Sequence, residues 1–222
     1  MDGIGCLFEA FLRCLPAGMQ TKIITYPTLI HLSYEQLEEL VASQLPATGG
    51  YLIIAESFSG PIALRLASRA LANLRGIVLV ASFAYRPLGW KGSVLARLPW
   101  NLLFRIPPPD FLLRSFLLGN SPSATEVDQI RSAIGKVNPH VLAARLQELL
   151  TSNYGKPHLL TTARVIALSA QDDHLFGPTS QRSISEVCPK AEIQFLPVPH
   201  LALQAAPVTV LKALQKLGVL PL

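Results

Sequence analysis

The sequence lacks several features that would place it in a specialised class of protein. No uncharged apolar run reaches the roughly 18 residues that a membrane-spanning helix needs, although half of the residues are hydrophobic. The amino terminus has no charged and then apolar segment of the kind found in signal peptides. The chain also has no internal repeat and no low-complexity tract. We therefore expect one globular domain over residues 1–222, a length sufficient for a sizeable core.

Cysteine is scarce, and its placement argues against both disulfides and metal sites. Cys6, Cys14 and Cys188 have no metal-like spacing, and we expect them to be small buried hydrophobic residues. Without a disulfide framework, the cytoplasm is the expected compartment. The net charge of +5 is mildly basic, but the positive residues are scattered and lack interleaved aromatic residues. This pattern argues against a nucleic-acid partner, and no motif in the chain predicts a metal or another cofactor.

Apolar, strand-like runs alternate with stretches of helical period along most of the chain. This alternation predicts an α/β fold, a mostly parallel sheet covered by helices on both faces. Strands are predicted over residues 21–26, 51–55, 76–82, 164–169 and 191–196. Helices are predicted over residues 6–16, 34–44, 60–73, 139–152, 178–187 and 206–217. Ser33 and Gln36 have the spacing of a capping box that begins the second of these helices.

The most informative stretch is Tyr-Leu-Ile-Ile-Ala-Glu-Ser-Phe-Ser-Gly, residues 51–60. An apolar strand leads directly into Ser57, and a helical period follows, which is the layout of a nucleophile elbow. Such a turn strains the serine backbone and leaves room only for small residues two positions before and after it, here Ala55 and Ser59. The alternative interpretation is an ordinary strand–helix turn with a capping serine.

An acid and a histidine follow Ser57 at the ends of two later predicted strands. Asp172 and Asp173 come just after strand 164–169, and His200 comes just after strand 191–196. An acid in that position can orient a histidine and stabilise the imidazolium that forms during catalysis. The chain order serine, acid, histidine is expected of α/β-hydrolases and differs from the orders of the chymotrypsin and subtilisin types.

The chain resembles the α/β-hydrolase superfamily over nearly all of its length, in a bacterial esterase/lipase-like branch. Ala-Glu-Ser-Phe-Ser-Gly-Pro resembles the elbow of that branch, and Pro-His-Leu-Ala-Leu-Gln-Ala-Ala-Pro resembles its histidine loop. Ala-Gln-Asp-Asp-His-Leu-Phe resembles its acid loop, in which the acid stands three residues after a small one. The resemblance therefore implies a three-layer sandwich and a catalytic triad of Ser57, Asp173 and His200, with Asp173 preferred over Asp172.

The amino terminus, Met-Asp-Gly-Ile-Gly, resembles the oxyanion loop of this branch. The resemblance implies an oxyanion hole formed by the backbone N–H of Phe58 and a second donor from Met1 or Asp2. In such relatives an apolar strand ending in Pro-Gly or His-Gly precedes the loop and lies between the strands that resemble residues 21–26 and 51–55. Its absence predicts a gap in the sheet with unpaired backbone groups. We expect that the true chain begins upstream of Met1, or that this is a shortened member with impaired activity.

Residues 85–138 interrupt the alternation, and we expect them to form a helical cap inserted into the domain. The segment is rich in leucine and aromatic residues and is broken by three consecutive prolines. One interpretation is a lid over Ser57 that binds an apolar acyl chain and touches a membrane surface. The other is simple packing on the core. The candidate substrate-binding residues in this segment are Trp90, Trp100, Phe104 and Phe111.

These motifs predict a serine hydrolase that acts on a small-molecule ester or thioester with an apolar acyl group. Acyl transfer to another alcohol uses the same triad, so an acyltransferase stays open. A non-catalytic, hydrolase-like binding protein is the alternative from a different class. Three further residues receive supporting interpretations: His174 as a surface histidine, Ser59 as a small packing residue and Glu56 as a hydrogen-bonding support.

Overall fold

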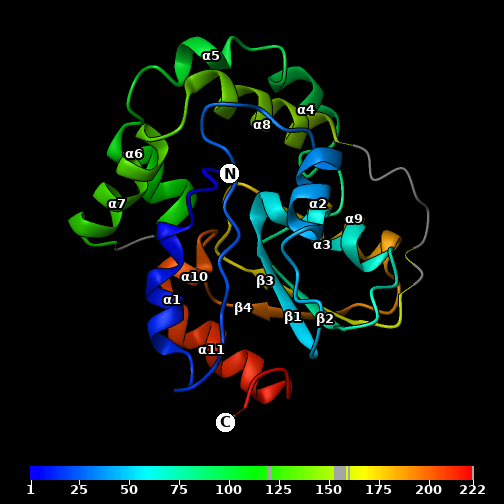
Figure 1. Ribbon diagram of the computed structural model, residues 1–222. Helices are drawn as coiled ribbons and strands as arrows, with labels where there is room; N and C mark the ends of the chain where they lie inside the picture. Colours follow the sequence, from blue (N-terminus) through cyan, green and yellow to red (C-terminus); the bar gives the residue numbers. More distant parts are fainter. Residues whose placement is uncertain (120–121, 153–158, 160, 222) are drawn as a thin grey trace.

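The structure, a computed structural model, describes residues 1–119, 122–152, 159 and 161–221. Its described part contains a sheet of four strands that pair in chain order, each parallel to the next (Figure 1). The strands are β1 (Tyr51–Glu56), β2 (Leu74–Val80), β3 (Arg164–Ala170) and β4 (Glu192–Leu196). The α/β architecture predicted from the alternation of strands and helices is therefore confirmed.

Helices cover both faces of the sheet because the central strands are apolar on both sides. Ile77 of β2 packs into the cluster that contains α3 (Gly60–Ala67), and its neighbour Val78 packs into the cluster that contains α11 (Pro207–Lys216). Successive side chains of a strand point to opposite faces, so one apolar run serves both clusters. Two further helices complete the layers, α9 (Pro178–Val187) on the α3 side and α1 (Glu9–Cys14) on the α11 side.

The other helices are mostly short. They are α2 (Tyr34–Ala42), α4 (Trp90–Leu95), α5 (Trp100–Leu103), α6 (Asp110–Leu113), α7 (Ala124–Gly135), α8 (Pro139–Thr151) and α10 (Ala202–Ala205). Two 3₁₀ turns, η1 (Cys6–Phe8) and η2 (Ser57–Ser59), and a π-helical stretch, η3 (Arg114–Leu118), complete the set. The predicted capping box is present, since the Ser33 hydroxyl accepts from the Gln36 N–H and the Gln36 side chain accepts from the Ser33 N–H. None of the helices described is long and apolar enough to cross a membrane.

The segment predicted to be a cap lies over the carboxyl ends of the strands. The Nδ1–H of His174, in the loop after β3, donates to the carbonyl oxygen of Ser115 at 2.8 Å. The N–H of Leu201, after β4, donates to the carbonyl oxygen of Leu117 at 2.9 Å. The stretch η3 therefore contacts both loops, which is where a cap is expected, and the division of the chain into domain and cap stays a prediction.

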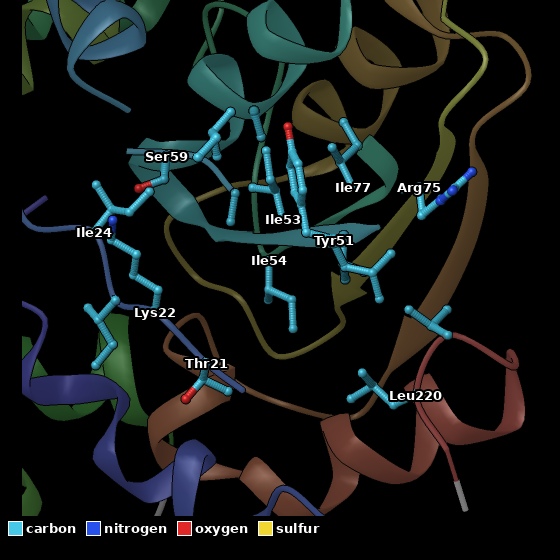
Figure 2. Close-up of a pocket in the computed structure, with 18 of the residues that line it drawn as sticks. Thr21, Lys22, Ile24, Tyr51, Ile53, Ile54, Ser59, Arg75, Ile77 and Leu220 are labelled. Carbon is cyan, nitrogen blue, oxygen red and sulfur yellow. The ribbon is translucent and has the colours of Figure 1, made fainter. Parts of the chain in front are cut away.

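Residues 21–26 do not form the predicted strand. Within the described part of the chain, the backbone groups of Thr21–Thr25 make no hydrogen bond, and only the N–H of Tyr26 donates, to the carbonyl oxygen of Gly3. A cavity of about 950 Å³ is lined by this stretch on one side and by β1 on the other (Figure 2). The predicted gap in the sheet is thus present, and without a neighbouring strand these residues cannot form a ladder.

Three smaller expectations also need correction. The helix predicted to reach residue 73 ends at Ala67, because the chain must turn back before β2 and does so with Ala70 at a φ of 51°. The second strand runs over residues 74–80 and not 76–82, because Ala81 leaves the extended conformation with a φ of 43°. Of the cysteines expected in the core, only Cys188 is buried; Cys6 is exposed in the short turn η1 at the surface.

Candidate active site

Ser57 lies where β1 passes directly into η2 and α3, and its backbone is strained. Its φ of 53° is in the left-handed region, which residues with a side chain rarely adopt. The hydroxyl of Ser82 donates to the carbonyl oxygen of Ser57 at 2.7 Å and holds the turn from below. The structure therefore contains the sharp strand-to-helix turn that the sequence predicts, with the serine at its apex.

The tightest packing beneath the turn is at Gly60. A Cβ atom on this residue would lie 1.8 Å from Ser82 Oγ and 3.2 Å from the carbonyl oxygen of Phe83. Ala55 is buried, and the Ser59 hydroxyl accepts from the Tyr26 hydroxyl at 3.0 Å, so both fill the small positions predicted for them. Sequence reasoning missed the constraint at Gly60. The available sign was its position, a glycine directly before the proline that starts the helix. No sequence pattern identifies Ser82.

The structure brings Ser57, His200 and Asp173 into one hydrogen-bonded chain. His200 Nε2 lies 2.8 Å from Ser57 Oγ, and His200 Nδ1 lies 2.8 Å from Asp173 Oδ2. The side chains of His200 and Asp173 are only 2% and 4% exposed, so the chain of bonds is shielded from bulk water. A nucleophile bonded to a base, which is in turn oriented by an acid, is the arrangement that activates a serine hydroxyl.

The carboxylate of Asp173 is fixed from both sides. Its Oδ1 accepts the backbone N–H groups of Leu175 and Phe176 at 2.8 and 2.9 Å, which leaves Oδ2 for the imidazole. The ring of Phe176 also meets the imidazole of His200 edge-on, with 4.9 Å between centroids. Asp172 is exposed, and its side chain bonds to no residue that the structure describes. Of the two adjacent acids, Asp173, which the resemblance of the acid loop prefers, is therefore the one placed against the histidine.

Glu56 ties the elbow to the histidine loop. Its carboxylate is nearly buried and accepts the backbone N–H of Leu203 at 3.0 Å and the side-chain amide of Gln204 at 2.9 Å. Burial raises the pKa of this carboxyl, and the two hydrogen bonds act in the opposite direction. Since both partners belong to α10, shortly after His200, the supporting role predicted for Glu56 has a concrete geometry.

Arg145 of α8 holds the amino-terminal loop. Its guanidinium is fully buried and donates to the carbonyl oxygens of Met1 and Asp2 at 2.9 Å each and of Pro27 at 2.6 Å. The ring of Tyr26 lies 5.7 Å from it, and burial lowers the pKa of the arginine. Sequence reasoning missed this residue, although a single arginine among the apolar positions of a predicted helix was an available sign.

Phe58 and Met1, two of the residues assigned to the oxyanion hole, lie in the same core cluster. The Phe58 ring is fully buried and stacks on Tyr34 with 4.8 Å between centroids, and Met1 packs against this cluster. The third residue, Asp2, uses its carboxylate to accept the backbone N–H of Ile4 at 3.1 Å. The assignment of their backbone N–H groups as oxyanion donors stays a prediction.

The four candidate substrate-binding residues fall into two pairs. Trp100 and Phe104 lie 5.9 Å apart between ring centroids, and Phe104 packs against the same buried cluster as Met1. Trp90 and Phe111 are 76% and 64% exposed and face solvent. The structure therefore brings only the first pair toward the amino-terminal loop, because Trp90 and Phe111 lie on the outer surface of the short helices α4 and α6.

Metal ligands do not gather in the described part of the chain, where no group of three or more histidine, cysteine, aspartate or glutamate side chains is arranged to hold an ion. The hydrogen-bonded chain of Ser57, His200 and Asp173 can support nucleophilic and acid–base chemistry. His174, next to Asp173, is exposed and turned toward Ser115, in agreement with the surface position predicted for it.

Comparison with solved structures identifies the fold. A hydrolase from Oleispira antarctica superposes with a TM-score of 0.74 at 13% identity, over 98% of this chain and 87% of that one. A thermophilic esterase from Thermogutta terrifontis gives 0.71 at 16% identity, over 96% and 84% of the two chains. An extracellular alpha/beta-hydrolase from a Paenibacillus species gives 0.67 at 14%, over 97% and 93%. No family model and no curated protein sequence matches the chain. The chain thus has the α/β-hydrolase fold.

Proposed function

We propose that the protein is a serine hydrolase that cleaves a carboxylic ester or thioester with an apolar acyl group. The observation that carries this proposal is the hydrogen-bonded chain from Ser57 through His200 to Asp173, with the serine at a strained strand-to-helix turn. The likeness to structures named as hydrolases and as an esterase supports hydrolase activity in general terms. Fold alone would not carry it, because one fold hosts many chemistries.

The proposed reaction follows from the order of the hydrogen bonds, from Ser57 to His200 and from His200 to Asp173. Ser57 Oγ attacks the carbonyl carbon of the substrate while its proton passes to His200 Nε2. Asp173 keeps the proton of Nδ1 between itself and the ring, so the imidazolium that forms is stabilised. The imidazolium then protonates the leaving group, and the acyl group stays on Ser57. Water, activated by the neutral His200, releases the acid, whereas an alcohol in its place makes the same site an acyltransferase.

When Ser57 attacks, negative charge develops on the carbonyl oxygen of the substrate, and two hydrogen-bond donors are needed to stabilise it. We assign one to the backbone N–H of Phe58 and the other to the loop of Met1 and Asp2, which Arg145 holds by the loop's carbonyl oxygens. With its carbonyl groups engaged by the guanidinium, the loop is positioned before the substrate arrives. A pre-positioned donor stabilises the transition state without reorganisation, and removing one typically lowers the rate about a hundred- to a thousandfold.

The preference for an apolar acyl group, and a peripheral contact with a membrane, rest on the composition of the segment over the strand ends. Its short helices and connections carry many large apolar side chains that are exposed, which is typical of surfaces that meet lipids or apolar ligands. They are Trp90, Val94, Leu98, Leu102, Leu103, Ile106, Phe111, Leu112 and Phe116.

A second candidate is a non-catalytic binding protein with the same fold. The cavity beside β1 favours it, because β1, which ends directly before Ser57, pairs on one side only within the described chain. A nucleophile at the end of such a strand is held less rigidly than one at the end of a strand paired on both sides. Because catalytic geometry tolerates little misplacement, this arrangement favours binding without catalysis.

A fluorophosphonate probe distinguishes the two candidates. If the protein is a serine hydrolase, the probe should label the native protein covalently. This labelling should be lost in Ser57→Ala and retained in Ser59→Ala, the matched control two positions away. Circular dichroism establishes that each protein is folded. Labelling that persists in Ser57→Ala would refute the assignment of the nucleophile. Absence of labelling in the folded native protein would favour the binding protein.

A further inference from the structure

We propose that the exposed side of α4 and α5 docks the protein onto a membrane surface that carries anionic lipid headgroups. We call this side the α4–α5 face. Its exposed apolar side chains are Trp90, Val94, Leu98, Leu102, Leu103 and Ile106, and its exposed cations are Arg86, Lys91, Arg97 and Arg105. The inference rests on the membrane contact proposed above and gives that contact a defined surface and a defined lipid chemistry.

The apolar side chains of α4 point away from the body of the protein. Gly92 lies against α8, since a Cβ atom at this position would come within 2.8 Å of the carbonyl oxygen of Leu150. Residues 90 and 94 each lie about 200° around the helix from residue 92, so both are on the side of α4 opposite α8. Trp90 and Val94 are accordingly 76% and 56% exposed. Figure 1 shows α4 and α5 beyond α8, on the side away from the sheet.

The same arrangement holds for α5. Trp100 and Phe104 are one turn apart and half-buried, and Phe104 packs against a buried cluster to which α8 contributes. Leu102, about half a turn from both, and Leu103 are exposed. The indole N–H of Trp100 donates to the carbonyl oxygen of Leu95 in α4 at 2.7 Å. The two short helices are therefore fixed to each other, and their outward apolar side chains form one pre-arranged surface.

Exposed apolar side chains are concentrated on this face. Of the fifteen large apolar side chains that are exposed in the described chain, six fall between Trp90 and Ile106. Single apolar residues scattered over a surface are ordinary, whereas a group of this kind marks a surface that meets an apolar phase or a partner. The α4–α5 face is therefore a candidate for docking rather than an ordinary solvated surface.

The charges of the face are all positive. Residues 86–109 contain four arginine or lysine residues and no aspartate or glutamate, so this stretch carries a charge of +4 in a chain whose net charge is +5. All four cations are exposed, and none forms an ion pair with a residue that the structure describes. A basic side chain close to an anionic bilayer strengthens binding about fivefold. The face therefore matches anionic headgroups in charge and the acyl boundary in apolar character.

These features favour an anionic bilayer over a protein partner. Acyl chains adapt to outward-facing side chains without a complementary surface, and the long stems of arginine and lysine keep their charges among the headgroups. A second copy of this chain is disfavoured, because a symmetric contact through the same face would place cations against cations. An acidic polypeptide also matches the charge, and the experiments below distinguish it from lipid.

Flotation with lipid vesicles tests the requirement for anionic lipid. The protein is mixed with vesicles of phosphatidylcholine alone or with about 30% phosphatidylglycerol. At about 0.05 M NaCl we expect the partition coefficient to be about a hundredfold higher on the anionic vesicles. Most of this difference should disappear at about 0.5 M NaCl, because salt screens the attraction. Equal partitioning onto the two kinds of vesicle would overturn the proposal and leave the contact with neutral lipid in place.

Two fourfold charge variants test the location of the contact. The combination of Arg86→Gln, Lys91→Gln, Arg97→Gln and Arg105→Gln should lower partitioning onto anionic vesicles about a hundredfold and leave partitioning onto phosphatidylcholine within about twofold. The matched control removes the same charge from exposed sites elsewhere and should cost less than about fivefold. It combines Arg182→Gln, Lys190→Gln, Lys212→Gln and Lys216→Gln. Equal losses in the two variants would refute the assignment to the α4–α5 face.

Tryptophan fluorescence tests whether the apolar side chains enter the bilayer. The protein has two tryptophans, of which Trp90 is exposed and Trp100 is half-buried with its indole N–H bonded to Leu95. Anionic vesicles with brominated acyl chains should quench the emission of the native protein. In Trp90→Phe, which keeps Trp100, the protein should still float with the vesicles but lose this quenching. Quenching that persists in Trp90→Phe would show that α4 does not enter the lipid.

Two further results would also overturn the proposal. Absence of flotation with every kind of vesicle would remove both this proposal and the membrane contact on which it rests. Binding of soluble polyglutamate as tight as binding to anionic vesicles, and lost in the charge variant of the α4–α5 face, would assign the face to an acidic polypeptide. Neither result bears on the proposed reaction, because fluorophosphonate labelling of Ser57 is measured without vesicles and tests the hydrolase separately.

Discussion

The carboxylate of Glu56 accepts the backbone N–H of Leu203, so the residue before the candidate nucleophile holds the helix that follows the candidate base. The two loops that must meet for catalysis are thus joined by a buried group adjacent to the reacting atoms. This bond couples the position of His200 to the protonation state of a buried acid.

Glu56→Gln should change how stability depends on pH. Burial raises the pKa of Glu56 in the folded protein above its unfolded value of 4.5, so the folded state binds this proton more tightly. The stability from this group is fully present below the unfolded pKa and is lost as the pH rises through the folded pKa. The free energy of unfolding of the native protein minus that of Glu56→Gln should therefore fall as the pH rises from below 4.5 to above it. Urea denaturation across this range measures it, and a difference that rises with pH would contradict the prediction.

Asp173→Asn should remove most of the activity without loss of fold. An amide at this position no longer selects the tautomer in which His200 Nε2 accepts the serine proton, so the esterase rate should fall about a thousand- to ten-thousandfold. Hydrolysis of p-nitrophenyl esters of increasing chain length provides the measurement. Asp172→Asn is the control and should leave the rate within about twofold, since a surface substitution away from the site changes little. A larger loss in the control would transfer the role to Asp172.

Arg145→Met should destabilise the protein by about 2–4 kcal/mol, because three partly buried carbonyl oxygens lose a charged donor. Arg105→Met is a matched substitution of an exposed arginine and should cost less than about 0.5 kcal/mol. Urea denaturation compares the two. Similar losses in both variants would mean that the amino-terminal loop does not depend on the buried guanidinium.

Gly60→Ala should cost about 1–3 kcal/mol, because the new methyl group overlaps the side chain of Ser82. The double variant with Ser82→Ala should recover part of that loss, because the 1.8 Å contact with Ser82 Oγ disappears while the contacts with the Cβ atom of residue 82 at 2.9 Å and with Phe83 at 3.2 Å remain. A double-mutant cycle in thermal or urea denaturation gives the coupling. Strictly additive effects would indicate that the backbone shifts away from the clash.

Trp90→Ser combined with Phe111→Ser should reduce partitioning onto phosphatidylcholine vesicles about tenfold, because two exposed aromatic side chains no longer enter the interface. Vesicle co-sedimentation measures binding, and fluorophosphonate labelling of Ser57 provides the internal control and should not change. Unchanged partitioning would remove the proposed membrane contact.

The sequence was sufficient to predict the strand-to-helix turn, the order of the three site residues and the class of fold, because these depend on local patterns. A serine after an apolar strand, and acidic and histidine residues after later strands, must lie at one edge of a parallel sheet. The resemblance of the acid loop favoured Asp173 over Asp172, because the acid of that loop stands three residues after a small residue. In the structure Asp173 is the residue whose carboxylate receives two backbone donors and faces the imidazole.

The remaining features depend on contacts between distant parts of the chain. Arg145 lies more than a hundred residues from the loop that it holds, and Ser82 is defined only by its contact with Ser57. The strand predicted over residues 21–26 was wrong for a related reason. Its apolar residues suit a strand, but a strand exists only where a neighbour supplies hydrogen bonds, and here the neighbouring space is a cavity.

The unpaired edge of β1 also has a consequence for the behaviour of the protein at high concentration. An uncharged edge of aromatic and β-branched residues is a template on which other chains can add as strands, and soluble proteins usually protect such edges with lysine, proline or a covering segment. β1 carries neither lysine nor proline along Tyr51–Ala55, and residues 21–26 face its edge only across the cavity. Refolding yield should therefore fall steeply as protein concentration rises, and aggregates should incorporate β1 in their ordered core.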